Sequence, residues 1–191
     1  MDTSRLDRTI VEHLSDLDSA AGEIERIERR VWEAMSERME EFASSAGWAG
    51  QYQIDDDLSV HPPEWTADGA RLAWFELGFG PDDDESGLNF DLARLCGVNG
   101  GQVCLWVLHG GRRTPWKAVA KAQAASLAGL GFSINDYANF YMDCTPSQAA
   151  MAQALSDDDF ELALQPLAQA LARLPSSVPA LTAMLQQAKV I

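Results

Sequence analysis

Apolar residues recur at steps of three and four between residues 4 and 45, and this repeat restricts the fold more than any other feature of the chain. The repeat consists of Leu6, Ile10, Leu14, Leu17, Ala21, Ile24, Ile27, Val31, Met35, Met39 and Phe42. Such spacing places the apolar side chains on one face of an α-helix. Ser4 with Asp7 provides an N-cap pattern, and Gly47 provides a stop. We therefore predict one long helix, or two helices in line, with the weak point at residues 19–22.

A helix of about 40 residues would be about 60 Å long, which exceeds what the rest of one domain needs. Three arrangements fit this length: a helix pair packed on a sheet, a projecting arm, and a coiled-coil dimer. The helix pair is the simplest. In the dimer, Ile24, Ile27 and Val31 would form the contact. Residues 4–45 are thus expected to be a helical arm or helix pair that can also serve homodimerisation.

Between Trp48 and Gly111 the pattern changes to short alternating segments separated by turn residues. The expected strands are 51–54, 58–61, 71–79, 88–95 and 102–108. In the third of these, Trp74 and Glu76 fall on the face opposite Phe75 and Leu77. Because the connections are short, we predict an antiparallel meander.

After Gly111 the chain becomes helical again, with one small hairpin. The expected elements are a helix over about 115–129, a hairpin of 132–134 with 137–142, a helix from Thr145 to about Leu155, a helix capped by Ser156 and running to about Leu174, and a last helix that Pro175 and Pro179 delimit and that reaches the C-terminus. The order of long helix, meander and C-terminal helices with a hairpin defines an α+β fold. We expect residues 1–191 to form a single domain.

The composition indicates a cytoplasmic protein without a membrane span. No apolar run approaches the roughly 18 residues that a span requires, and the first residues lack a signal-peptide pattern. Cys96, Cys104 and Cys144 are odd in number and form no CxxC pair, which argues against disulfides. The three histidines are far apart and show no zinc-ligand spacing. We expect no metal and no cofactor.

Net charge is the unusual bulk property of the chain, at −15 near neutral pH. Residues 1–50 hold 12 acids and 6 bases, residues 51–110 hold 11 and 2, and residues 111–191 hold 6 of each. All the excess negative charge therefore lies in the first 110 residues. Such a field attracts basic proteins and repels nucleic acid, because phosphate binding depends on lysine and arginine. Direct nucleic-acid binding is not expected.

Three acidic clusters are candidate sites: residues 55–57, 82–85 and 157–159. Several carboxylates can hold Ca²⁺ or Mg²⁺, but the alternation, the central glycine and the closing glutamate of calcium loops are not combined in either of the first two clusters. The third cluster fits the start of a helix, where acids favour the helix dipole. We expect the first two clusters to be a negative surface. The residues expected to bind a partner are Asp55, Asp56, Asp57, Asp82, Asp83, Asp84, Glu85 and, as an aromatic anchor, Trp65.

Glu76 and Asp91 are the carboxylates that most suggest catalysis, since each stands in an otherwise apolar expected strand. Metal-dependent nucleases carry an Asp and a Glu on adjacent strands, with a lysine two residues after the second acid. That lysine is missing here, because Gly78 and Ala93 stand at the corresponding positions. The simpler interpretation places both acids on the solvent side of a one-sided sheet.

Motifs for nucleophilic or phosphate chemistry are weak. No GxSxG, Walker or GxGxxG pattern occurs in a suitable context. Cys104 and His109 stand five residues apart on an expected strand and so face opposite sides. The segment 109–113 (HGGRR) can hold an anion in a loop before a helix.

These observations favour a non-enzymatic, acidic protein that inhibits or regulates a basic partner, such as a nuclease or a nucleic-acid-binding complex. In composition it resembles, by physical analogy alone, nuclease inhibitors, immunity proteins and phage counter-defence proteins such as anti-CRISPRs, which act as DNA mimics. Two alternatives remain: a metal-dependent nuclease or hydrolase using Glu76 and Asp91, and a structural protein that assembles through its N-terminal helix.

Overall fold

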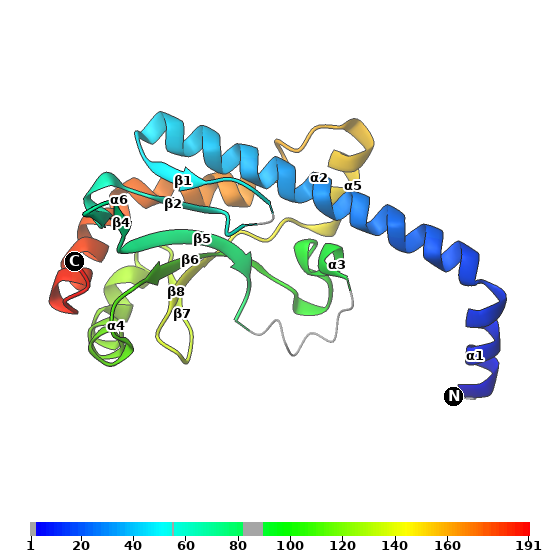
Figure 1. The fold of residues 1–191 in the computed structure, drawn as a ribbon, viewed down its shortest axis with the longest axis horizontal. Helices are drawn as coiled ribbons and strands as arrows, with labels where there is room; N and C mark the ends of the chain where they lie inside the picture. Colours follow the sequence, from blue (N-terminus) through cyan, green and yellow to red (C-terminus); the bar gives the residue numbers. More distant parts are fainter. Residues whose placement is uncertain (1–2, 55, 82–89) are drawn as a thin grey trace.

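A computed structural model describes residues 3–54, 56–81 and 90–191. Two helices, α1 (Thr3–Glu12) and α2 (Leu14–Ala46), come first. A sheet follows, and three further helices of ten residues or more occur in the described chain: α4 (Arg113–Ala128), α5 (Gln148–Asp157) and α6 (Gln165–Gln187). Short helical turns occur at η1 (Pro63–Trp65), α3 (Asp91–Leu95) and η3 (Val98–Gly100). The predicted α+β order is confirmed (Figure 1).

The main sheet is antiparallel throughout and has the strand order β1-β2-β5-β6-β8-β7. Its strands are β1 (Ala49–Gln51), β2 (Ser59–His61), β5 (Ala73–Phe79), β6 (Val103–His109), β7 (Ser133–Ile134) and β8 (Phe140–Asp143). The long central pair β5–β6 runs from Ala73 opposite His109 to Phe79 opposite Val103. A separate small hairpin joins β3 (Thr66–Ala67) to β4 (Ala70–Arg71). Positive φ angles at Asp68 and Gly69 make its two-residue turn.

The helices cover one face of this sheet. Helix α2 contacts β1 and β2, α6 contacts β8, and α2 and α6 contact each other, while α4 packs against α6 and β7 (Figure 1). Phe75 on β5 and Leu105 on β6 are buried beneath these helices. Trp74 and Glu76 alternate with the buried residues of β5 and remain partly exposed. The sheet is therefore one-sided, as the alternation of β5 predicts.

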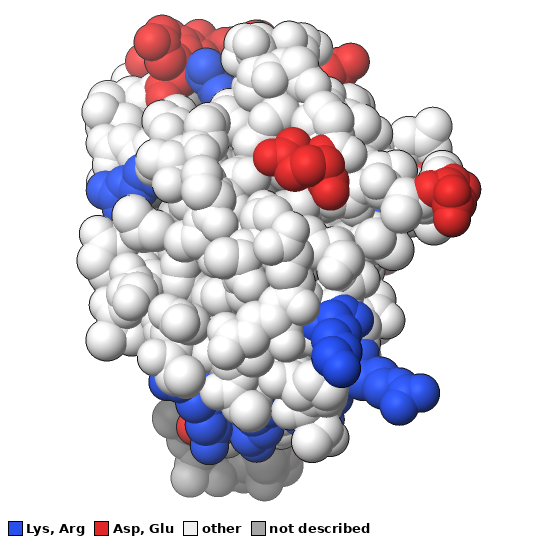
Figure 2. All heavy atoms as spheres, turned by 90° about the vertical axis from the view of Figure 1, so that its left-hand side faces the viewer, with Lys and Arg blue, Asp and Glu red and all other residues white. Residues whose placement is uncertain are grey.

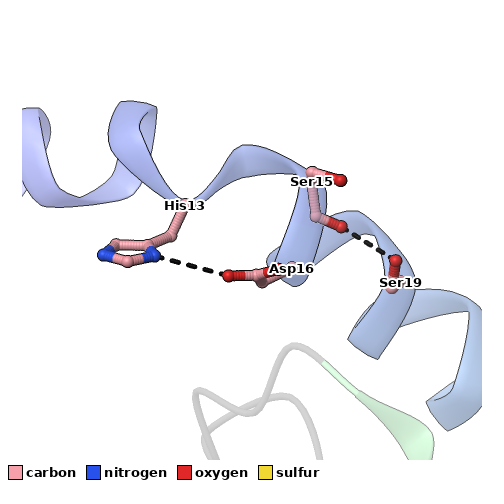
Figure 3. A network of polar contacts seen from close by, with 4 residues as sticks. All are labelled: His13, Ser15, Asp16 and Ser19. Carbon is pink, nitrogen blue, oxygen red and sulfur yellow. Dashed lines mark hydrogen bonds and ion pairs between the residues drawn. The ribbon is translucent and has the colours of Figure 1, made fainter.

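The break in the N-terminal helix lies at His13 and not at residues 19–22. The backbone N–H of His13 is shared between the carbonyl oxygens of Thr9 and Ile10, each at 3.2 Å, and its ψ of 20° leaves the helical range. Figure 3 shows that Ser19 instead donates its hydroxyl to the Ser15 carbonyl at 2.9 Å, within a continuous α2. The predicted stop at Gly47 is confirmed, since Gly47 takes the left-handed conformation and donates to Ala43.

The expected strand over residues 88–95 is wrong. Residues 88 and 89 lie outside the described residues, but Asp91–Leu95 form helix α3. The backbone N–H of Leu92 donates to Glu28 Oε1 on α2 at 2.8 Å. This contact with a distant carboxylate stabilises a helical start that no local alternation reveals.

The C-terminal helices also begin at other residues than expected. Ser156 lies inside α5, which starts after its N-cap Ser147, so Ser156 caps no helix. Helix α6 begins at Gln165 with Pro166 in its first turn and continues through Pro175 and Pro179. Near these prolines, serine hydroxyls bond the carbonyls of Arg173 and Leu174, at 2.8 Å each. The structure thus has one helix where two were predicted.

Within the described residues, none of the helices combines the length and the apolar character that a membrane crossing requires.

Candidate functional site

Of the acids expected to bind a partner, the structure describes Asp56 and Asp57, and both are exposed in the loop between β1 and β2. The other five, Asp55, Asp82, Asp83, Asp84 and Glu85, lie outside the described residues. The loop carrying Asp56 is tied to α2, because the Ser36 hydroxyl donates to the carbonyl oxygen of Tyr52. Asp56 and Asp57 therefore lie in a loop that is held against α2.

Trp65 does not have the exposure that a partner anchor requires. Its side chain is completely buried, packs against Phe75 with ring centroids 5.0 Å apart, and donates its indole N–H to Thr182 on α6. A short helical turn after Pro63 directs the ring into the core. The expectation that Trp65 contacts a partner is therefore wrong.

Helix α2 adds a row of acids that the sequence clusters did not include. Glu33, Glu37, Glu40 and Glu41 are all exposed, opposite the buried Met35 and Met39. Burial raises the pKa of the nearby Tyr52 hydroxyl, and the negative charge of Glu40 raises it further. The row therefore produces a negative potential that reaches the β1–β2 loop.

A third set of acids flanks α2 on its other side. The end of α5 and the segment that follows it carry the exposed residues Asp157, Asp158, Asp159 and Glu161. Arg30 of α2 contacts Asp158 at 2.6 Å, and Arg38 lines a hollow of about 300 Å³ together with Asp159 and Glu161. These contacts hold the segment against α2. We call the three sets together the acidic face: Glu33, Glu37, Glu40, Glu41, Asp56, Asp57, Asp157, Asp158, Asp159 and Glu161.

The expectation that Asp157–Asp159 begin a helix is wrong, and the correction changes their interpretation. Asp157 is the last residue of α5, and Asp158 takes the left-handed conformation just after it, with φ 56°. The C-terminus of a helix carries partial negative charge, so acids there are unfavourable for helix stability. Within the described chain, only Asp158 and Glu41 of the acidic face have an ion-pair partner. Helix stability therefore does not explain this cluster.

Basic residues gather elsewhere on the molecule. Residues 92–135 contain no Asp or Glu, yet they include four bases at or near the start of α4: Arg112, Arg113, Lys117 and Lys121. In Figure 2 the lysines and arginines in view lie mainly toward the lower end of the molecule, where Figure 1 places α4, while acidic side chains lie toward its upper end. Acidic and basic side chains are thus largely separated on the face that Figure 2 shows.

Glu76 and Asp91 do not lie on adjacent strands. Glu76, on β5, accepts a 2.7 Å hydrogen bond from Trp74 Nε1, whereas Asp91 begins α3 and contacts Arg94 at 3.1 Å. Burial raises the pKa of the Glu76 carboxyl, partly offset by the Trp74 bond. Among the residues the structure describes, no three His, Cys, Asp or Glu side chains gather in a way that would hold a metal ion. The strand pairing on which the nuclease alternative depends is therefore not present.

The cysteines are poorly suited to nucleophilic attack. Burial raises the pKa of the Cys144 thiol to about 12 and that of Cys104 still further, and it also raises the pKa of the half-buried Cys96. A thiolate is the reactive form, and these environments disfavour it.

Comparison of this chain with protein-family models, with characterised proteins and with solved structures gave no significant match.

Proposed function

We propose that this protein binds a basic macromolecular partner through the acidic face and thereby inhibits or regulates it. A nuclease or another nucleic-acid-handling protein is the class of partner whose binding surface such a face would complement. The observation that carries the proposal is the separation of charge, with exposed acids around α2 and bases around α4. Such a field steers a basic partner to one side of the molecule.

The arrangement of the acidic face supports this proposal over a role in stability. Among the described residues, eight of its ten carboxylates form no ion pair, and the cluster after α5 stands at the unfavourable end of a helix dipole. Repulsion among such groups destabilises a folded chain. A basic partner bound to the acidic face would offset this repulsion, because its positive charges would lie beside the carboxylates.

The spacing of the acids is compatible with imitation of a phosphate backbone. Carboxylates four residues apart on α2, such as Glu33 and Glu37, are separated by about 6 Å along the helix axis. The four glutamates from Glu33 to Glu41 span about 12 Å, or one charge about every 4 Å, and one DNA strand carries a charge about every 3.4 Å of axis. The loops on both sides of α2, with Asp56 and Asp159, bring the charge density closer to that value.

A capture experiment from the native host, with the full-length protein on a support, tests the proposal. The test variant changes Glu33, Glu37, Glu40 and Glu41 to Gln. The matched control changes Asp16, Asp18, Glu23 and Glu25 to Asn or Gln, which alters net charge by the same amount on the part of α1–α2 distant from the acidic face.

We expect a basic protein to be retained at about 50 mM salt and released at about 500 mM, where screening is strong. The test variant should lose it and the control should keep it. Equal loss in both variants, or no specific partner at either salt, would contradict the proposal.

A second candidate function is self-assembly through the N-terminal arm, which we define as residues 6–21. Eight large hydrophobic side chains are exposed in the described chain, and five of them lie here: Leu6, Ile10, Val11, Leu14 and Leu17. A ten-residue helix such as α1 is marginal in water unless it packs on something. The arm extends away from the sheet (Figure 1), so a contact there keeps two negatively charged bodies apart.

A second copy of the chain is the occupant we propose for this apolar stripe, because identical helical faces of this spacing can pack against each other about a two-fold axis. Arg8 with Glu12 and Arg26 with Glu23 form ion pairs within each helix, so the apolar side chains supply the contact. The contact residues differ from those predicted, because Val31 is completely buried against the body. Ile10→Glu with Leu17→Glu should convert a dimer to a monomer in sedimentation analysis, whereas Leu162→Glu, at an exposed residue outside the arm, should not. A monomeric wild type at about 100 µM, far above a typical nanomolar-to-micromolar dissociation constant, would rule this function out.

A further inference from the structure

A hollow of about 540 Å³ lies at the start of α4, between the ends of β5 and β6 and the turn that joins β7 to β8. Its volume is within the range of about 300–1,000 Å³ that small-molecule sites occupy. Its walls include Trp74, Leu108 and His109 from the sheet, Arg113 from the first turn of α4, and Asn139. The hollow is formed by residues that the acidic face does not use.

The charge of this hollow is opposite to that of the whole chain. Arg113 is the charged residue in its lining, and none of the lining residues is Asp or Glu. A second hollow of about 490 Å³ shares Arg113 and adds Lys117 and Lys121 from the same side of α4. Asp136 is next in sequence to the lining residue Tyr137, but it is exposed and does not line either hollow. A negatively charged ligand is therefore attracted here in spite of the net charge of −15.

Neutral hydrogen-bond donors supplement the arginine. His109 Nδ1 accepts the backbone N–H of Gly111 at 3.1 Å, so in the neutral ring the hydrogen is on Nε2 and that atom donates. Burial lowers the pKa of His109, which favours this neutral form near pH 7. The ring is held against Trp116, with centroids 4.4 Å apart. The N-cap residue Arg112 makes no side-chain cap, so the backbone N–H groups of Arg113 and Thr114 in the first turn of α4 can also donate, whereas Pro115 has none.

The remaining wall is aromatic and is held rigidly. The guanidinium of Arg71 lies 4.1 Å from the ring centroid of Trp74, and Trp74 donates its N–H to Glu76 at 2.7 Å. Arg113 lies 5.2 Å from the ring centroid of Tyr137, which also lines the hollow. A flat apolar group can pack against Trp74 and Leu108 without having to order them first.

We propose that this hollow binds a small organic anion, in which a phosphate or carboxylate is carried on a flat aromatic ring. Arg113, His109 and the first turn of α4 receive the anionic group, while Trp74 and Leu108 receive the ring. The proposal is independent of the acidic face and of any macromolecular partner.

Titration calorimetry of the full chain with four probes tests the proposal: phenyl phosphate, benzoate, inorganic phosphate and phenol. The ring-bearing anions should bind at least tenfold more tightly than inorganic phosphate and phenol, and the order of phenyl phosphate and benzoate identifies the preferred anionic group. Arg113→Gln should weaken binding of the preferred probe at least tenfold. The matched control Arg173→Gln removes the same charge from an exposed residue outside the hollow and should leave binding within twofold.

The variant Trp74→Leu distinguishes the contribution of the ligand's aromatic ring from that of its anionic group. It should weaken phenyl phosphate and benzoate but leave inorganic phosphate unchanged, and its folding is checked by circular dichroism. If it proves unfolded, shifts of the Trp74 and Trp116 indole N–H signals in the wild type replace it, and these should move with phenyl phosphate before the other four indole signals. No binding of either ring-bearing anion at millimolar concentration would overturn the proposal. Equal loss in Arg113→Gln and Arg173→Gln, or inorganic phosphate binding as tightly as phenyl phosphate, would overturn it too.

Discussion

Trp65 donates its indole Nε1–H to the hydroxyl oxygen of Thr182 across 2.8 Å, and this bond joins the turn after β2 to α6, 117 residues further along the chain. The Trp65 ring is completely buried, so its polar N–H has no access to water. A buried donor requires a partner, and Thr182 provides it. The bond therefore helps to fix α6 on the helical side of the sheet.

Removal of that hydroxyl should destabilise the fold. Thr182→Val keeps the shape of the side chain but leaves the indole N–H unpaired, and we expect the free energy of unfolding to fall by about 1–3 kcal/mol. Thr182→Ser retains the hydroxyl and should lose less. Urea unfolding followed by tryptophan fluorescence measures both. If the valine variant is as stable as wild type, the bond contributes nothing to stability.

Gly111 and Val190 should show strong coupling. A Cβ atom added at Gly111 would lie closer to the Val190 side chain than van der Waals contact allows. Overpacking of this kind typically costs about 1–3 kcal/mol, so Gly111→Ala should lower the free energy of unfolding by that order. Val190→Ala in the same chain should recover much of the loss, and the four proteins of this double-mutant cycle are compared by urea unfolding. Additive effects of the two substitutions would show that the chain relieves the contact elsewhere.

The elements that the sequence predicted well are those with a long, regular signal. The apolar repeat from Leu6 to Phe42 extends over many turns, and a glycine such as Gly47 is favoured where a helix ends in the left-handed conformation. The alternation in β5 is sustained enough to place Trp74 and Glu76 on the outer face. A hydrophobic period predicts the type of secondary structure when it is repeated over more residues than chance would produce.

The elements that were missed depend on contacts between distant residues. The few alternating residues before Leu95 fit a strand or a short helix, and the Glu28 bond to Leu92 favours the helix. Ser156 has a cap pattern, yet it stands inside α5, because Ser147 caps that helix instead. The hollow beside α4 joins Trp74 with Arg113 and Asn139, and only the pairing of the strands brings them together. A sequence pattern alone reveals one part of it, the segment 109–113.

The cysteines should differ in accessibility in the folded protein. Cys104 and Cys144 are fully buried, and burial raises the pKa of both thiols, to about 12 for Cys144. Cys96 is half-buried beside a groove of about 270 Å³. We therefore expect iodoacetamide at pH 8 to modify at most one thiol of the native chain, and all three after denaturation. Cys96→Ser should abolish the native-state reaction, whereas Cys144→Ser should not affect it. Two thiols reacting rapidly in the native protein would contradict the burial of the other pair.

The stability of the fold should decrease as the pH falls below about 6.5, the ordinary pKa of histidine. Burial lowers the pKa of both His61 and His109, and the positive charge of Arg71 lowers that of His61 further. Because the folded chain holds these rings neutral, the unfolded chain binds more protons between pH 6.5 and the lowered pKa values, and protonation favours unfolding. Glu76 acts with the opposite sign, since its raised pKa makes the folded chain the better proton acceptor above the ordinary carboxyl pKa.

The two effects separate in a Glu76→Gln background, which removes the contribution of the carboxylate. In that background the free energy of unfolding, measured in urea between pH 7.5 and 5, should fall steadily as the pH decreases. Adding His61→Asn or His109→Asn should each make the decline shallower, because each removes one group that must gain a proton on unfolding. In His109→Asn the amide oxygen can still accept the Gly111 N–H, so the comparison isolates charge from the hydrogen bond. A profile that stays flat in the Glu76→Gln background, or one that neither histidine substitution alters, would show that the two rings titrate alike in the folded and unfolded chains.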